Sequence, residues 1–306
     1  MKVALFDTGL DPTDAVIRRQ LGRITYKSFI PGEESHTAKD AKDENGHGTH
    51  CAALLLKVAK NSEVYIGRVT MGKKLESPEY ISQVRPRPSP IESLPGTNLR
   101  QAIEWAISEG VNLISMSFGF PRYTQALTDI QSSILSAYQS GIIIFAAASN
   151  GGGNSGLAYP ANQNEVICIG ASDGKGNKSD FTPGPYPDIS NYTTLGEGVT
   201  SSWPKALSQT GQERTKIMSG TSVATPIAVG IAAMVVDFLR QIPRDVDQNF
   251  EFLVEKQLRS KKGMNAVLKR LTEERDGFMY IAPWILFCDD RKEGVAQVLL
   301  DALRSC

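Results

Sequence analysis

The sequence of 306 residues has few cysteines and no long uninterrupted apolar run. Its four cysteines fit no metal-binding spacing and are too few for a disulfide scaffold at this length. No run reaches 18 apolar residues, so no membrane span is expected. The N-terminus has no basic region followed by an apolar one, so no signal peptide is visible. These absences favour a cytoplasmic, leaderless protein in a reducing compartment, with an excised domain of a secreted protein as the alternative.

An excess of charge of either sign is also missing. Lys plus Arg and Asp plus Glu each number 33, so no net field favours nucleic acid or a membrane surface as a partner. Apolar residues make up 41% of the chain and charged residues 22%, which is typical of a globular protein with a substantial core. The length permits one large domain or two ordinary ones.

Apolar strands alternate with amphipathic helices along the first 240 residues. Strands are predicted at residues 2–6, 64–69, 111–117, 142–148 and 165–171. Helices are predicted at residues 51–59, 99–109, 123–139 and after Ser222. Strands alternating with helices of this length predict the α/β class, with a mostly parallel sheet covered by helices on both faces.

Two segments differ in character from this alternation. Residues 73–98 are rich in proline and poor in apolar residues, which predicts an exposed, mobile insertion. Residues 241–306 read as a helical C-terminal extension of the 1–240 domain, with helices at residues 249–259, 264–271 and 294–304. This extension could be a small appendage or could complete the main domain.

Three polar side chains each lie at the end of an element, next to glycine: Asp7 after a strand, His47 at a helix start, and Ser222 at the mouth of the apolar run 227–239. Taken singly, each has a simpler explanation as a turn aspartate, a polar capping turn or an N-cap serine. A metal site built from His47, His50 and His36 is the rival for the histidine cluster, but no Glu stands between the first two as in a zinc protease helix. Taken together, an acid, a base and a hydroxyl are the parts of a nucleophilic catalytic site.

Four motifs in this order resemble those of the subtilisin-like serine proteases, the subtilases. The resemblance covers roughly residues 1–240, and the order Asp, His, Ser is that of the family. The motifs are Leu5-Phe6-Asp7-Thr8-Gly9, Asn45-Gly46-His47-Gly48-Thr49-His50-Cys51-Ala52, Ala146-Ala147-Ala148-Ser149-Asn150 and Ser219-Gly220-Thr221-Ser222-Val223-Ala224-Thr225-Pro226. The resemblance implies a three-layer α/β/α subtilisin-like fold with a central, mostly parallel sheet.

The resemblance also implies roles for these residues. Ser222 would attack the scissile carbonyl and form an acyl-enzyme, and His47 would take its proton. Asp7 would fix the His47 tautomer. The side-chain amide of Asn150 and the backbone N–H of Ser222 would form the oxyanion hole. The expected activity is therefore that of a serine endopeptidase that hydrolyses peptide bonds.

The substrate-binding residues follow from the same resemblance. The segment Ser117-Phe118-Gly119 resembles the strand that pairs with the substrate backbone. Ala147 and Ala158 resemble walls of the pocket for the residue before the cut, and Tyr159-Pro160 is a candidate cis bond. Two departures from the family pattern are expected to narrow this pocket: Ser149 stands where glycine is usual before the asparagine, and Phe120 stands where a second glycine is common.

The expected cofactors and partners are few. No cofactor or metal is expected, because residues 52–62 run from helix to strand without the loop that carries the family's strong calcium site; a weak calcium site stays open. Cys51 resembles the cysteine beside the histidine in the proteinase K and kexin branches and implies sensitivity to mercurials. The partners implied are a protein or peptide substrate, and a propeptide or parent-protein domains outside this chain.

Two alternatives to a general endopeptidase stay open at this point. One is a catalytically silent subtilase that binds peptides or partners. The other is a module of a larger protein whose proteolysis acts on one tethered target. The C-terminal extension has a likeness to intracellular subtilase domains of fungal multidomain proteins, which bears on the second alternative.

Overall fold

The computed structural model describes residues 1–33, 35–72, 95–187, 189–208, 212–288 and 292–306. Most of the proline-rich insertion predicted at residues 73–98 lies outside these ranges. Its last residues are part of a helix, because α4 already begins at Pro95.

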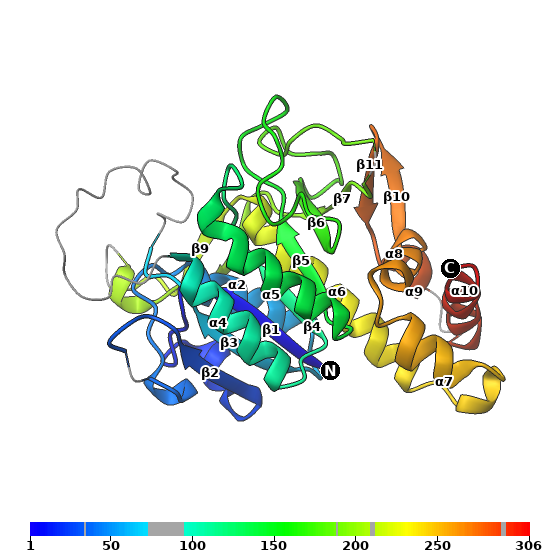
Figure 1. Ribbon diagram of the computed structural model, residues 1–306, viewed down its shortest axis with the longest axis horizontal. Helices are drawn as coiled ribbons and strands as arrows, with labels where there is room; N and C mark the ends of the chain where they lie inside the picture. The colour runs from blue at the N-terminus through cyan, green and yellow to red at the C-terminus, as the bar shows by residue number, and fades with distance from the viewer. Residues whose placement is uncertain (34, 73–94, 188, 209–211, 289–291) are drawn as a thin grey trace.

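A nine-stranded sheet forms the centre of the molecule, in the order β10-β11-β7-β6-β5-β4-β1-β3-β2 (Figure 1). All neighbours from β11 to β2 pair in parallel, and only β10 with β11 is antiparallel. A separate antiparallel pair joins β8 and β9. The strands are β1 Lys2–Asp7, β2 Ile24–Ser28, β3 Glu63–Arg68, β4 Leu113–Met116, β5 Ile143–Ala147, β6 Val166–Ser172, β7 Tyr192–Leu195, β8 Val199–Ser202, β9 Thr215–Met218, β10 Thr272–Arg275 and β11 Phe278–Ile281.

Helices cover both faces of this sheet and complete three layers. α4 and α5 pack on one face, whereas α2 and α6 pack on the other (Figure 1). The helices are α1 Ala15–Arg18, α2 His47–Val58, α4 Pro95–Ser108, α5 Thr128–Gln139, α6 Thr221–Arg240, α7 Phe250–Phe252, α8 Lys261–Lys269, α9 Trp284–Phe287 and α10 Lys292–Arg304. The predicted α/β/α class is confirmed.

Helix α6 is the apolar centre of one of these two faces. It lies against α2 and against the middle strands of the sheet. Among the described residues it is also the helix long and apolar enough to cross a membrane, but 72% of its apolar window is buried inside the protein. A core helix satisfies the same length and composition test, and its burial explains the apolar run that follows Ser222.

Some predicted boundaries differ from the observed ones. Helix α2 begins at His47 rather than at Cys51, so the histidine motif forms its first turn. Helix α5 begins at Thr128 rather than at residue 123. Tyr138, predicted on its core face, is 41% exposed, because Ala137 turns toward the core instead.

The C-terminal extension contributes strands as well as helices. The helices predicted there are present, but β10 and β11 form a hairpin, and β11 pairs in parallel with β7. The Tyr192 hydroxyl of β7 donates to the carbonyl of Asn265 in α8 over 3.0 Å. Buried side chains of α8 and α10, such as Leu268 and Leu299, belong to the same apolar cluster as α2 and α6. The extension therefore adds to the main sheet and to its core.

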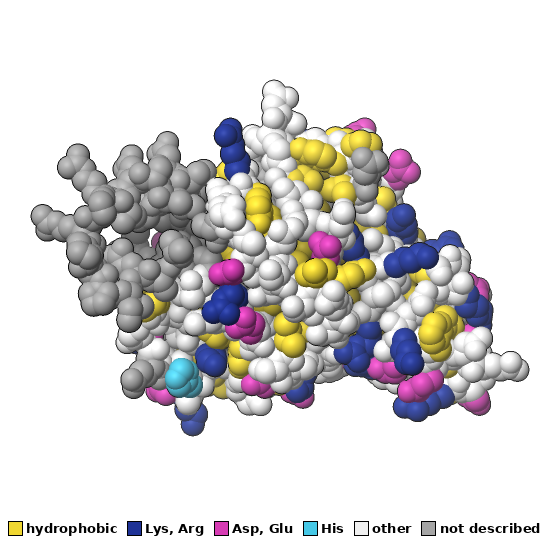
Figure 2. Space-filling view, viewed as in Figure 1, with side chains coloured by type: hydrophobic (Ala, Val, Ile, Leu, Met, Phe, Trp, Pro, Cys, Tyr) yellow, Lys and Arg dark blue, Asp and Glu magenta, His cyan; other side chains and the backbone are white. Residues whose placement is uncertain are grey.

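The outer surface carries charges of both signs. Figure 2 shows Lys and Arg side chains interspersed with Asp and Glu on the face it draws, with hydrophobic side chains in small groups between them. This mixture agrees with the equal numbers of acidic and basic residues in the sequence.

We expect truncation after Leu239 to abolish cooperative folding. The cut removes β10, β11 and the apolar side chains of α8 and α10, each large one worth about 2 kcal/mol of burial, from a fold whose net stability is about 5–15 kcal/mol. Thermal unfolding followed by circular dichroism measures the effect. Leu268→Ala should lower stability by about 2–5 kcal/mol, whereas the exposed Val298→Ala should change little. A truncated chain that melts like the full chain would show that the extension is only a connector.

Candidate active site

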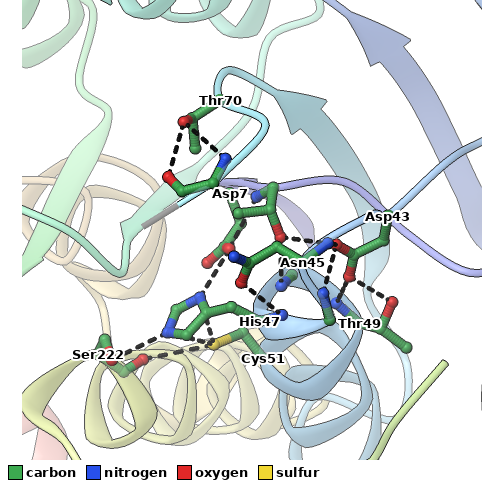
Figure 3. A network of polar contacts seen from close by, with 12 residues as sticks. Asp7, Asp43, Asn45, His47, Thr49, Cys51, Thr70 and Ser222 are labelled. Atoms are coloured by element: carbon green, nitrogen blue, oxygen red, sulfur yellow. Dashed lines mark hydrogen bonds and ion pairs between the residues drawn. The ribbon is translucent and has the colours of Figure 1, made fainter. Parts of the chain in front are cut away.

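The three residues singled out in the sequence come from three different elements on one side of the sheet. Asp7 is the last residue of β1, His47 the first residue of α2 and Ser222 the second residue of α6. Because β1 lies between β4 and β3, its carboxyl end is flanked by a parallel strand on each side, at the edge of the sheet where ligand sites of parallel sheets form. The starts of α2 and α6 meet at this edge (Figure 3).

These three side chains form one continuous line of hydrogen bonds. Asp7 Oδ1 lies 2.7 Å from His47 Nδ1, and His47 Nε2 lies 2.9 Å from Ser222 Oγ (Figure 3). A carboxylate only accepts, so the proton of the neutral imidazole sits on Nδ1. Nε2 is then left to accept the hydrogen bond of the Ser222 hydroxyl.

The environment of His47 favours its charged form. Burial of the ring lowers its pKa, but the charge of Asp7, the neighbouring Cys51 and the hydrogen bonds to both raise it, and together they bring the His47 pKa well above its ordinary value of 6.5. The carboxylate is itself 2% exposed. The imidazole can therefore accept a proton from Ser222 and be stabilised as the imidazolium.

Two glycines allow the elements to come this close. A Cβ on Gly48 would lie 2.3 Å from the carbonyl oxygen of Gly9, so the start of α2 rests directly on the backbone that follows β1. A Cβ on Gly220 would lie 3.1 Å from Ser222 Oγ and 3.3 Å from Asn150 Nδ2. A side chain at position 48 would push α2 away from the backbone after β1, whereas one at position 220 would press on the side chains of Ser222 and Asn150.

Pro226 and Cys51 together shape the start of α6. Pro226 has no N–H, so the carbonyl of Ser222 lacks its usual partner one turn later in the helix. The buried Cys51 thiol donates to that carbonyl over 3.5 Å and also lies 3.7 Å from His47 Nδ1. Burial raises the pKa of Cys51, so its thiol stays protonated and able to donate. Cys51 thus contacts both His47 and Ser222.

Asn150 follows β5 and presents its amide to the same point. Its Oδ1 accepts from the Thr221 backbone N–H over 2.8 Å and from the Thr221 hydroxyl over 3.0 Å. Two donors fix Oδ1 in this direction, and the Nδ2 group is left facing the space beside Gly220 and Ser222.

A cleft of about 270 Å³ opens beside Ser222 and Asn150. All the substrate-binding residues predicted from the sequence line it: Ser117, Phe118, Gly119, Ala147 and Ala158. Four further residues complete the lining: Pro121, Ser149, Gly151 and Thr221. No side chain on this lining, as far as the described residues define it, is charged. The Tyr159-Pro160 bond, a candidate cis bond, is cis.

Of the two departures expected to narrow the cleft, only one lines it. Phe120 is buried and packs on Tyr159 with ring centroids 6.4 Å apart, because its backbone pairs with that of Tyr159 in both directions. Its ring therefore turns into the core and away from the lining. Ser149 does line the cleft, and its φ of 148° is a conformation that favours glycine.

The histidine cluster does not converge on one point. The His50 ring is fully buried, and its Nε2 lies 3.2 Å from the carbonyls of Val199 and of Lys216. Burial lowers the pKa of His50 to about 4, so the ring is neutral and joins α2 to the β8–β9 pair. His36 is exposed on the segment that follows β2. The metal hypothesis for these three residues is therefore disfavoured by geometry.

One acidic residue at the site was missed from the sequence. Asp43 lies before α2 and accepts hydrogen bonds from the backbone of Gly46 over 2.8 Å and of Thr49 over 2.8 Å. An aspartate a few residues ahead of a helix is a capping signal. That signal was hidden because the helix was predicted to begin at Cys51 rather than at His47.

Comparison with known proteins agrees with this geometry. The model of the Subtilase family matches residues 1–262. The chain is 30% identical over 274 residues to the subtilisin-like protease het-Q2 of Podospora anserina, covering 86% of this chain and 68% of that protein. It is 29% identical to subtilisin DY of Bacillus licheniformis, covering 77% and 76%. It spans about half, 53%, of the alkaline protease of Alkalihalobacillus alcalophilus, also at 29% identity.

Solved structures show the same fold. The prenylagaramide maturation protease PagA superposes with a TM-score of 0.63 at 20% identity, covering 99% of this chain and 93% of that one. A cold-adapted subtilisin-like serine proteinase superposes with a TM-score of 0.62 at 21% identity, covering 92% and 88%. The class defined by these findings is that of the subtilisin-like serine peptidases. The chain belongs to the subtilase family.

We expect Ser149→Gly to stabilise the protein. A non-glycine residue in such a backbone conformation costs about 1–3 kcal/mol, whereas glycine costs about 0.5–1 kcal/mol through its freedom in the unfolded chain. The free energy of unfolding in urea should therefore rise by roughly 1 kcal/mol. The matched control is Ser132→Gly on the exposed face of α5, which should destabilise by about 0.5 kcal/mol. A loss of stability in Ser149→Gly would show that the hydroxyl, which accepts from Gly151 N–H over 3.2 Å, outweighs the strain.

Proposed function

We propose that this chain is a serine endopeptidase that acts through Asp7, His47 and Ser222 and an acyl-enzyme intermediate. The observation that carries the proposal is the line of hydrogen bonds of 2.7 Å and 2.9 Å that joins these side chains beside an open cleft. Ser222 Oγ attacks the scissile carbonyl while His47 Nε2 takes its proton. The imidazolium then gives that proton to the leaving amine, and water releases the acyl group by the same route in reverse.

The oxyanion is held by two donors in this proposal. Asn150 Nδ2 is the first, because its Oδ1 is already engaged by Thr221. The backbone N–H of Ser222 is the second; it lies at the start of α6 and has no hydrogen-bond partner among the described residues. One such donor is worth about 3 kcal/mol of the barrier.

An extended peptide is the substrate that the cleft supports. The segment Ser117–Gly119 continues β4 along one wall of the cleft, where main-chain hydrogen bonds can hold a substrate backbone with little regard to its sequence. The uncharged lining beside Ala147 and Ala158 favours a neutral side chain before the cut. Partners beyond a protein or peptide substrate, such as a propeptide or parent-protein domains, stay part of the proposal.

Labelling by a fluorophosphonate probe tests the proposed nucleophile. We expect the full chain to be labelled and Ser222→Ala to be unlabelled, with Ser219→Ala as the matched control that keeps labelling. Mass spectrometry of the labelled peptide identifies the modified residue. A folded wild type that takes no label would favour the catalytically silent subtilase that binds peptides.

The pH dependence tests the roles of His47 and Asp7. Only neutral His47 accepts the proton, so labelling and peptide hydrolysis should rise with pH through its raised pKa. Asp7→Asn removes the charge that raises this pKa, so the rise should move to lower pH while the rate falls by about 10⁴-fold. If the rate in Asp7→Asn rises at the same pH as in the wild type, the titrating group that controls the rise is not His47.

We also propose that the chain functions without the family's strong calcium loop. Helix α2 ends at Val58 and β3 begins at Glu63, so residues 59–62 alone connect them. We expect excess chelator to leave the melting temperature unchanged and added Ca²⁺ not to raise it, because a ligand stabilises only a state that binds it. A drop of several degrees on chelation would reveal a calcium site.

A further inference from the structure

Asp43 accepts more hydrogen bonds than any function proposed so far requires. Its Oδ1 accepts from the Thr8 hydroxyl over 2.9 Å, from Asn45 N–H over 3.1 Å and from Gly46 N–H over 2.8 Å. Its Oδ2 accepts from the Thr49 N–H over 2.8 Å and from the Thr49 hydroxyl over 2.6 Å (Figure 3). A helix cap alone would need only the bonds to the first turn of α2.

The bond to Thr8 connects Asp43 to the strand that bears Asp7. The Thr8 N–H donates to Asp7 Oδ1 over 2.8 Å, and this is the same oxygen that faces His47. The Thr8 hydroxyl also accepts from the Gly48 N–H over 2.8 Å, in the turn of helix that bears His47. Asp43 and Thr8 therefore fix the end of β1 and the start of α2 relative to each other.

A second charged group, on the neighbouring strand β3, contacts the segments that join β1 to α2. Arg68 is fully buried in β3, in register with Asp7 of the neighbouring strand. Its Nη1 donates to the carbonyl of Thr8 over 3.1 Å and to that of Lys42 over 2.8 Å, while Nη2 pairs with Glu44 over 2.9 Å. The residues on both sides of Asp43 are thus held by Arg68, and the carboxylate has little freedom to turn away from Thr8.

We propose that Asp43 is a positioning residue for the reaction: through Thr8 it sets the direction of the Asp7 carboxylate toward His47. The proposal rests on the function proposed above. Without the Asp43 carboxylate, the Thr8 hydroxyl loses its acceptor, and the Thr8 N–H holds Asp7 Oδ1 less firmly in line with His47 Nδ1, although Arg68 still binds the Thr8 carbonyl. Misplacement of reacting groups by about 1 Å can cost about 10²-fold in rate.

Kinetics of Asp43→Asn test this proposal. Asparagine keeps the shape but turns an amide N–H₂ group toward donors, so the contacts to Thr8 or to Thr49 fail. We expect kcat for a peptide substrate to fall by about 10- to 100-fold, with KM changed by less than about twofold, since Asp43 does not line the cleft. The matched control is Asp40→Asn, an exposed aspartate whose side chain contacts Thr37 and which should leave both constants unchanged. A change in melting temperature with kcat preserved would reduce Asp43 to a helix cap and overturn the proposal.

Thr8 variants test the same route while leaving the Asp43 carboxylate in place at the start of α2, although the Thr8 hydroxyl also accepts from the Gly48 N–H of that turn. Thr8→Ser keeps the hydroxyl and should retain the activity, whereas Thr8→Val should lose about as much kcat as Asp43→Asn. The double variant Asp43→Asn with Thr8→Val should lose little more than either single variant, because both remove one link. Fully additive losses would show that Asp43 acts by another route. These variants also decide the matter if Asp43→Asn fails to fold.

Titration of His47 by NMR separates this proposal from the proposed function. Asp7 raises the His47 pKa, so a loosened Asp7 should let that pKa fall toward its ordinary value in Asp43→Asn and in Thr8→Val, but not in Asp40→Asn. This readout needs no turnover. Absence of labelling at Ser222 would defeat the proposed function, whereas an unchanged His47 titration in folded Asp43→Asn would defeat the positioning role alone.

Discussion

The contact of 2.7 Å between the Asp7 carboxylate and His47 is the constraint on which the rest of the site depends. It joins the end of an inner strand of the sheet to the start of a helix, through two residues that lie 40 positions apart in the sequence. A buried carboxylate is costly unless it is paired and hydrogen-bonded. Here the partner of Asp7 Oδ1 is an imidazole whose other nitrogen faces Ser222, so the group that pairs with the carboxylate also prepares the nucleophile.

The fold holds the two partners of this contact in place. The register of β1 with its parallel neighbours β3 and β4 fixes the position of Asp7. The helices α2 and α6 are buried on one face of the sheet, and their first residues lie at the edge where β1 ends. Small residues then set the distance, since Gly48 rests on Gly9. The C-terminal hairpin extends the same sheet at the end away from β1, so it supports the site indirectly, through the shared apolar core.

The parts of the site that could be predicted are those that local sequence determines. Asp7, His47, Ser222 and Asn150 each follow or begin an apolar element next to a glycine or a helix start. In the structure the first three are joined by hydrogen bonds, and Asn150 binds Thr221 beside Ser222. The β10–β11 hairpin was missed although Asp276-Gly277 is a strong hairpin turn signal, because the strand before it, Thr272–Arg275, is too polar to read as a strand. The direction of the Phe120 ring could not be predicted either, because it depends on backbone pairing with Tyr159, which is distant in sequence.

The two helix starts at the site differ in charge, and this difference fits their separate roles. Neither α2 nor α6 has an acidic residue in its first turn. The positive end of α2 is nevertheless offset by Asp43, which accepts from Thr49 N–H, and by Asp7 nearby. The start of α6 has only the neutral Asn150 oxygen, bound to Thr221. A negative charge that develops beside Ser222 is therefore stabilised by the positive end of the α6 dipole, which no carboxylate offsets. The positive end of α2 is already offset by carboxylates, and this helix start serves to hold His47 in place.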